Sequence, residues 1–144
     1  MKGRILWLDN DLTYIMPYVA VLRDEGYAVT AVTTPLEAEA AINNSQFELL
    51  IVDAMIPTKT ESEENLYNPA ETDFGHKTGV VFYQRNQKRL TSAKTKVLVL
   101  TVRLDRDVAN DFFQAGLPRD CFTTKLALRD VRTLSMKVES VLKH

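Results

Sequence analysis

Five short apolar runs recur along the chain, separated by segments with helical spacing. The runs are RILWL (4–8), AVTAV (28–32), FELLIV (47–52), KVLVL (96–100) and CFTT (121–124). The central runs are continuously apolar rather than alternating, which is typical of parallel strands buried on both faces. We therefore expect five strands in a parallel sheet.

The segments between these runs predict helices. After the first run, Ile15, Val19 and Leu22 share one helical face, and Gly26 stands where a helix C-terminus would be capped. Thr34-Pro35-Leu36-Glu37 is a capping box with proline at the first helical position. Three more helices are expected at about 79–90, at about 105–115, where Gly116 ends the helix, and at about 128–142. Strict alternation of strand and helix predicts an α/β fold with helices on both faces of the sheet.

Length and composition fit one ordinary globular domain over 1–144. The chain has 144 residues, 45% of them hydrophobic, with a net charge of -1. This charge gives no electrostatic case for binding nucleic acid or an anionic membrane. No apolar run is long enough to span a bilayer, and the N-terminus lacks a signal-peptide pattern. Cys121 is the only cysteine, so an internal disulfide is impossible, and we expect a cytoplasmic protein.

Polar side chains with a shared chemistry follow four of the five predicted strands. They are Asp9, Asn10 and Asp11 after the first run, Asp53 after the third, Thr101 after the fourth and Lys125 after the fifth. In parallel α/β sheets the functional site lies beyond the carboxyl ends of the strands. We therefore expect these groups at one rim, although singly each has a structural explanation, such as an aspartate that caps a helix.

A long polar connection at about 57–78 interrupts the compact pattern. Connections of this length in a small domain are either functional or disordered. Within it, Tyr67 and Phe74 are candidates to dock onto the domain or a partner, or to belong to a mobile segment. His76 is expected to be solvated rather than a metal ligand.

The opening stretch ILWLDNDLT resembles the first motif of the haloacid-dehalogenase-like phosphatases. In that resemblance Asp9 is the nucleophile, Asp11 the general acid/base, and Thr101 and Lys125 the later motifs. That family needs a further strand ending in acids after its lysine. Only about twenty residues follow Lys125, and they predict a single helix, so this phosphatase is a remote alternative.

The whole chain resembles the receiver domains of two-component response regulators, including the chemotaxis regulators. RILWLDND matches their first strand with its acidic end, and LLIVDAMIP matches the phosphoacceptor signature with Asp53, Met55 and Pro57. VLVLT supplies the strand-four hydroxyl, QAG the end of helix four, and CFTTK the strand-five lysine. The resemblance implies the flavodoxin-like (βα)5 receiver fold, doubly wound, with strand order 2-1-3-4-5.

The resemblance also implies a phosphoprotein with a magnesium-dependent site. Asp53 would form an aspartyl phosphate, with Lys125 and Thr101 contacting the phosphoryl oxygens. Mg2+ would be held by Asp9, Asn10, Asp53 and the backbone carbonyl of Met55. Thr101 and Phe122 would form the switch, and Phe122, which lacks a hydroxyl, could signal only by packing.

Two residues depart from or elaborate the receiver pattern. Asn10 replaces the usual second acid, so we expect weaker metal binding unless Asp11 compensates. Arg103 would flank the phosphoryl group and could shield it from water. The competing interpretation is a receiver-like interaction module that works without phosphorylation.

The implied partners are those of two-component signalling. The donor would be a sensor histidine kinase or a histidine phosphotransfer protein, and the output an unknown protein target, with a homodimer possible. We expect no direct nucleic-acid or membrane contact, and no enzyme activity beyond self-catalysed phosphoryl transfer and slow autodephosphorylation. Both a standalone receiver and an excised domain fit this sequence.

Overall fold

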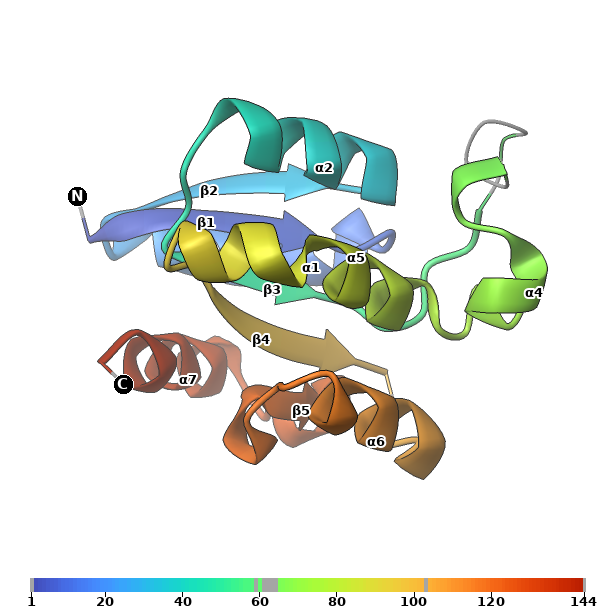
Figure 1. Ribbon diagram of the computed structural model, residues 1–144. Helices are drawn as coiled ribbons and strands as arrows, with labels where there is room; N and C mark the ends of the chain where they lie inside the picture. Colours follow the sequence, from blue (N-terminus) through green and yellow to red (C-terminus); the bar gives the residue numbers. More distant parts are fainter. Residues whose placement is uncertain (1, 59, 61–64, 103, 144) are drawn as a thin grey trace.

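A five-stranded parallel sheet forms the centre of the molecule (Figure 1). The computed structural model describes residues 2–58, 60, 65–102 and 104–143. The strands are β1 (Gly3–Leu8), β2 (Tyr27–Val32), β3 (Leu49–Val52), β4 (Lys96–Thr101) and β5 (Phe122–Thr124). They pair in parallel in the order β2-β1-β3-β4-β5, which confirms the predicted doubly wound 2-1-3-4-5 sheet.

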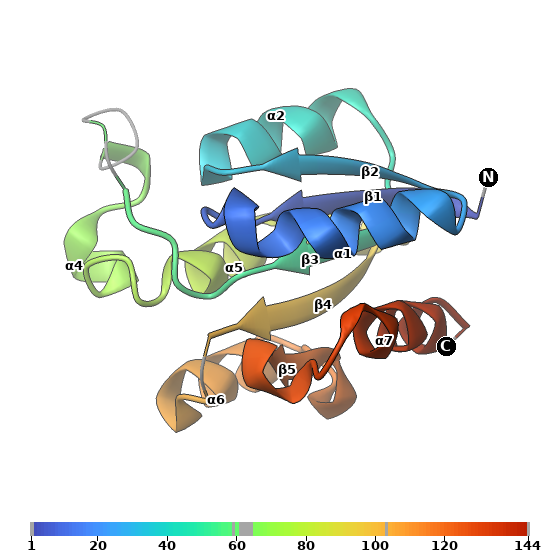
Figure 2. The same ribbon diagram turned by 180° about the vertical axis from the view of Figure 1, so that it is seen from behind.

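Helices cover both faces of this sheet. One face carries α1 (Leu12–Asp24) and α7 (Val131–Lys143), which contact each other (Figure 2). The opposite face carries α2 (Pro35–Asn44), α5 (Thr78–Ser92) and α6 (Arg106–Gln114) (Figure 1). The sheet is thus buried between two helical layers, which explains why all four residues of β3 are apolar and buried.

Local signals in the sequence set several helix ends. The Asp11 side chain accepts a hydrogen bond from the Tyr14 amide at 3.1 Å and caps α1. Thr34 caps α2 in the same way by accepting from the Glu37 amide at 3.2 Å. Gly116, with φ of 110°, follows the end of α6 as predicted.

Two predicted boundaries were wrong by a few residues. The run 47–52 forms a strand only from Leu49, and the predicted helix 128–142 begins at Val131. The chain first makes the short 3-10 turns η1 (Arg119–Cys121) and η2 (Lys125–Ala127) around β5. The η2 turn is the element that carries Lys125 out of β5 to the rim of the sheet.

The long connection at 57–78 contains the short helix α4 (Pro69–Thr72), which lies beyond the carboxyl ends of the strands (Figure 1). Tyr67 is fully buried, and its hydroxyl donates to Glu39 on α2. The Arg85 guanidinium on α5 lies 4.5 Å from the centre of the Tyr67 ring. Phe74, by contrast, is 82% exposed. Of the alternatives for these two aromatic residues, Tyr67 docks onto the domain and Phe74 stays at the surface.

Of the helices that the structure describes, none combines the length and the apolar character needed to cross a membrane.

Candidate functional site

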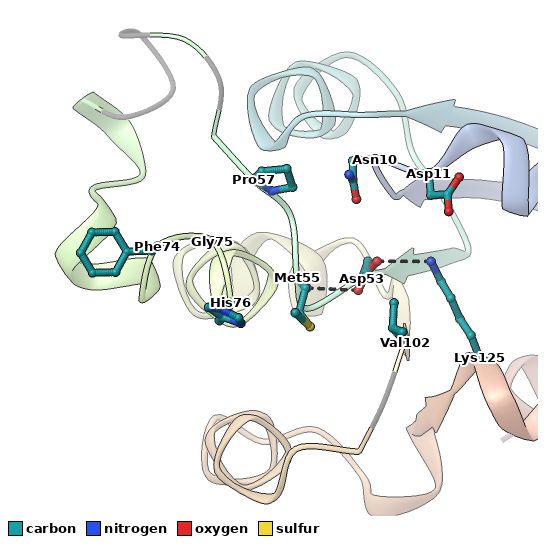
Figure 3. A pocket seen from close by; sticks show the side chains of 10 residues that line it. All are labelled: Asn10, Asp11, Asp53, Met55, Pro57, Phe74, Gly75, His76, Val102 and Lys125. Atoms are coloured by element: carbon teal, nitrogen blue, oxygen red, sulfur yellow. Dashed lines mark hydrogen bonds and ion pairs between the residues drawn. The ribbon is translucent and has the colours of Figure 1, made fainter.

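Asp53 lies directly after β3, at the centre of the carboxyl rim (Figure 3). Its side chain is 2% exposed. The Met55 amide donates to Asp53 Oδ1 at 3.1 Å, and Lys125 Nζ lies 3.4 Å from Asp53 Oδ2. The Asp53 amide donates to the Leu8 carbonyl at 3.0 Å, which ties the carboxylate to the end of β1. The central position of β3 therefore fixes Asp53 beside the residues that follow β1.

The three polar residues after β1 take three different positions. Asp9 is fully buried, and its Oδ1 accepts from the Asp11 amide at 2.8 Å. Asn10 is exposed and lines the cavity above Asp53 (Figure 3). Asp11 caps α1 and also lines this cavity. The structural role foreseen for an aspartate as a helix cap therefore belongs to Asp11, whereas Asp9 faces the buried charges.

Lys125 joins the two buried carboxylates. Its Nζ lies 2.8 Å from Asp9 Oδ2 and 3.4 Å from Asp53 Oδ2, and its side chain is almost fully buried. A buried ammonium between two carboxylates neutralises only part of their charge. One net negative charge therefore remains at the base of the cavity when all three groups are ionised.

Burial dominates the protonation equilibria of these groups. Desolvation raises the pKa of Asp9, and Lys125 offsets only part of this effect. Desolvation, followed by the charge of Asp9, raises the pKa of Asp53. Burial alone would lower the pKa of Lys125, but its hydrogen bond with Asp9 and the charge of Asp53 raise it instead. Lys125 therefore stays protonated near neutral pH.

Thr101 and Phe122 occupy the neighbouring strands at the same edge. Thr101 ends β4 with its side chain buried, and its Oγ1 makes no close hydrogen bond among the described residues, although its interaction with the Asp53 carboxylate acts to lower the pKa of Asp53 without outweighing burial. Phe122 in β5 packs its ring against Phe112 and Phe113 of α6, at centroid distances of 6.0 and 5.9 Å. A displacement of the Phe122 ring would therefore change its packing against α6.

A cavity of about 340 Å³ opens above Asp53. The lining residues are Asn10, Asp11, Asp53, Met55, Pro57, Phe74, Gly75, His76, Val102 and Lys125 (Figure 3). Asp53 is among them, whereas Asp9 is not. The 57–78 connection contributes one wall of this cavity, which the sequence pattern did not reveal. His76 in that wall is exposed.

Gly79 is a residue of this site that sequence reasoning missed. A Cβ added to Gly79 would lie 2.2 Å from the Asp53 carbonyl oxygen and 2.8 Å from the Cα of Ala54. The Gly79 amide donates to the Ala54 carbonyl at 2.9 Å. The available signal was a glycine in the first turn of a helix, where it weakens the helix unless close packing requires it.

The site residues expected from the sequence thus converge on one rim. Asp9 and Asp53 each contact Lys125, Asn10 and Met55 line the cavity above Asp53, and Thr101 lies at the end of the adjacent strand. Arg103 lies outside the described residues. Among the described residues, no group of three or more His, Cys, Asp and Glu side chains is placed to hold a metal ion. The predicted magnesium site is a different kind of set: two carboxylates, an amide and a backbone carbonyl.

Comparison of the sequence with known proteins finds distant similarity to a group of transcriptional regulators. No protein-family model matches the chain. It is 25% identical over 149 aligned positions to the alginate biosynthesis transcriptional regulatory proteins AlgB of Pseudomonas putida and Pseudomonas aeruginosa. These alignments cover 97% of this chain and 29% of each relative, so the chain spans less than a third of their length.

Solved structures resemble the chain along its whole length. A CheY-like response regulator receiver domain protein from Methanospirillum hungatei superposes with a TM-score of 0.74 at 22% identity, covering 97% of this chain and 93% of that one. A response regulator from Thermotoga maritima gives a TM-score of 0.73 at 15% identity, with both chains fully covered. Together with the strand order and the arrangement of helices, these similarities show that the chain has the fold of the response regulator receiver domains.

Proposed function

We propose that this protein is a phosphoacceptor receiver in which Asp53 accepts a phosphoryl group and thereby changes the binding of a partner protein. The observation that carries the proposal is the difference between the two buried aspartates. Asp53 lines the open cavity and also contacts Lys125, whereas Asp9 contacts Lys125 but does not line the cavity. A phosphoryl donor in the cavity can therefore reach Asp53. Asp9, which is not part of the cavity lining, is placed to contribute negative charge next to Lys125.

The transfer step is a displacement at phosphorus. With acetyl phosphate as donor, an Asp53 carboxylate oxygen forms a bond to phosphorus, and the bond from phosphorus to the acetate oxygen breaks. Acetate leaves with the electron pair. Lys125 lies beside the accepting carboxylate and supplies positive charge for the phosphoryl oxygens, which supports its assignment as a phosphoryl-binding group.

Mg2+ is the cofactor that the donor set fits. Asp9, Asn10, Asp53 and the Met55 carbonyl would hold it, since all four offer hard oxygen atoms and magnesium needs only one or two carboxylates besides water. When bound, it neutralises charge so that a carboxylate and a phosphoryl group can approach each other. The residual negative charge around Lys125 supports this role for a cation.

Thr101 and Phe122 are proposed as the switch. The Thr101 hydroxyl is buried near Asp53 and makes no close hydrogen bond among the described residues, so a phosphoryl oxygen on Asp53 would offer it one. Movement of Thr101 would be transmitted along β4, which pairs with β5 at Phe122. Phe122 would then signal through its packing on α6.

The proposed partners follow from this chemistry. A sensor histidine kinase or a histidine phosphotransfer protein would donate the phosphoryl group, and a downstream protein would read the switched surface. Apart from this self-catalysed transfer and slow hydrolysis of the aspartyl phosphate, we propose no enzyme activity. A single receiver domain over residues 1–144 and a cytoplasmic location remain proposals.

One observation favours the phosphorylation-independent module as the second candidate. Lys125 holds Asp9 Oδ2 at 2.8 Å, and the exposed neighbour Asn10 carries no charge. If this ion pair outcompetes the metal, the pocket is a fixed structural element. Partners would then read one constitutive state.

Two assays on wild type and two variants separate these possibilities. Wild type, Asp53→Asn and Asp9→Asn are incubated with acetyl phosphate with and without Mg2+, and intact mass is recorded. One phosphoryl adduct that needs Mg2+ and Asp53 supports the receiver, whereas no adduct on wild type supports the inert module. Turnover of p-nitrophenyl phosphate that is abolished by Asp9→Asn and kept by Asp53→Asn would support the phosphatase.

A further inference from the structure

Tyr14, on the first turn of α1, makes two contacts with Lys125. The Lys125 ammonium lies 4.8 Å from the centre of the Tyr14 ring, and the Tyr14 hydroxyl donates to the Lys125 carbonyl at 3.4 Å. We propose that Tyr14 is a positioning residue that holds the Lys125 ammonium over the phosphoacceptor during phosphoryl transfer. This inference rests on the proposed function of Asp53.

The ring is chemically distinct from the other partners of Lys125. Asp9 and Asp53 both hold the ammonium now, but in the proposed reaction both carboxylates are needed by the metal, and Asp53 also becomes phosphorylated. The face of a tyrosine ring attracts a cation without being a strong ligand for magnesium. Tyr14 is therefore the contact that Lys125 can keep through the whole step.

A second cavity offers the Lys125 side chain an alternative position. This cavity of about 410 Å³ is lined by Asp11, Tyr14, Tyr18, Val102, Lys125, Leu126 and Leu128. It shares Asp11, Val102 and Lys125 with the phosphoacceptor cavity. A lysine side chain is flexible, so once its carboxylate partners are engaged elsewhere it could turn toward this space. In its present position the ammonium lies both 4.8 Å from the centre of the Tyr14 ring and 3.4 Å from Asp53 Oδ2, so the attraction of the ring helps to keep it beside Asp53.

Both the backbone and the side chain of Tyr14 make further contacts. Its amide donates to the Asp11 side chain at 3.1 Å, which fixes the residue to the start of α1. Its ring lies 5.4 Å from the ring of Tyr18, and the two hydroxyls are 3.4 Å apart. Burial, then the hydrogen bond with Tyr18, raises the pKa of Tyr14, so the side chain stays a neutral phenol. A neutral ring does not repel the incoming phosphoryl group.

The test measures the rate of phosphorylation by acetyl phosphate at saturating Mg2+ in Tyr14→Phe, Tyr14→Trp and Tyr14→Leu. We expect the aromatic variants within about twofold of wild type and the leucine variant slower by roughly tenfold, the scale of a partly desolvated cation–π contact. Mg2+ affinity, measured by isothermal titration calorimetry, should stay unchanged in all three variants. Tyr27→Leu is the matched control, since it removes another tyrosine ring that faces a lysine ammonium, at the start of β2 and away from the carboxyl rim, and it should keep the wild-type rate.

A second series of variants distinguishes the cation–π attraction of the ring at position 14 from the effect of its size and shape. Phenylalanines with one, two and three ring fluorines are placed at position 14, which weakens the cation–π attraction with little change in ring size. We expect the rate to fall stepwise with each fluorine, at an unchanged melting temperature. Equal rates across the fluorine series, or a wild-type rate for Tyr14→Leu, would overturn the role of Tyr14 alone. Absence of an adduct on wild type would overturn the proposed function, and this inference with it.

Discussion

Gly79 lies against the backbone of Asp53, so closely that a Cβ on Gly79 would stand 2.2 Å from the Asp53 carbonyl oxygen. Real carbon–oxygen contacts do not reach this distance, so any side chain at position 79 must push the helix and the loop apart. The start of α5 and the phosphoacceptor loop are thus fitted to each other through one residue. The position of Asp53 depends on a glycine 26 positions away in the chain.

Gly79→Ala should therefore disturb the site and lower stability. We expect a loss of about 1–3 kcal/mol in the free energy of unfolding, typical of overpacking a tightly packed site. We also expect phosphorylation by acetyl phosphate to slow at least severalfold, because Asp53 moves relative to Lys125. Urea denaturation and intact mass measure the two effects. Gln84→Ala, at an exposed position of α5, is the control, and a Gly79→Ala protein that matches it would contradict the close approach.

Asp53→Asn should stabilise the protein at neutral pH. Burial and the charge of Asp9 raise the pKa of Asp53 above its ordinary 3.8, so the folded state binds this proton more tightly than the unfolded chain does. The stability from that protonation is fully present below the unfolded pKa and is lost as pH rises through the folded one. An amide carries no charge at any of these pH values, and Lys125 keeps Asp9 as a partner. We expect a gain of about 1–2 kcal/mol at pH 7.5.

This gain should shrink as pH falls toward the acid range, because wild type then protonates the buried carboxyl. Urea unfolding of both proteins between pH 7.5 and 4.5 measures the difference. Asp24→Asn, an exposed carboxylate at the end of α1, is the matched control and should show little change. A constant difference across the pH range would show that Asp53 is not titrating in that window.

Tyr67 should anchor the 57–78 connection. Its ring is fully buried under Arg85, and its hydroxyl donates to Glu39. Tyr67→Ala removes a buried aromatic side chain, at a cost of about 3–5 kcal/mol. Because the segment can open without the sheet, we expect amide exchange over 67–78 to rise at least tenfold while β1 and β3 stay protected.

Hydrogen exchange with mass spectrometry tests this local opening. Phe74→Ala is the matched control, because it removes an aromatic residue from the same segment that is 82% exposed. Equal exchange in the two variants would mean that the burial of Tyr67 does not hold the segment.

Lys94→Gly should stabilise the end of α5. Lys94 has a φ of 57°, and its amide donates to the Thr91 carbonyl while the Thr95 amide donates to Leu90. This is the helix-ending motif that usually places glycine in the left-handed position. Relief of the left-handed conformation should give about 1 kcal/mol. Lys88→Gly, within the same helix, should instead destabilise by about 1 kcal/mol. Thermal melts compare the pair, and a loss in both would contradict the assignment.

The pattern of residues along the chain is enough to predict the sheet and the chemistry of its rim. Buried parallel strands need continuous apolar residues, and β1, β3 and β4 had them; the residues that follow those strands necessarily meet at one edge. The caps at Thr34, Gly26 and Gly116 could be predicted because they act through the local backbone.

The position of each individual polar group, by contrast, depends on the folded structure. Asp9 and Asp11 are two residues apart and chemically identical, yet one is buried against Lys125 and the other caps a helix. That division depends on burial and on a lysine more than a hundred residues away. Likewise, Tyr67 docks and Phe74 does not because α2 and α5 offer partners to one of them. Such partners are set by packing between distant segments, which no local pattern of residues encodes.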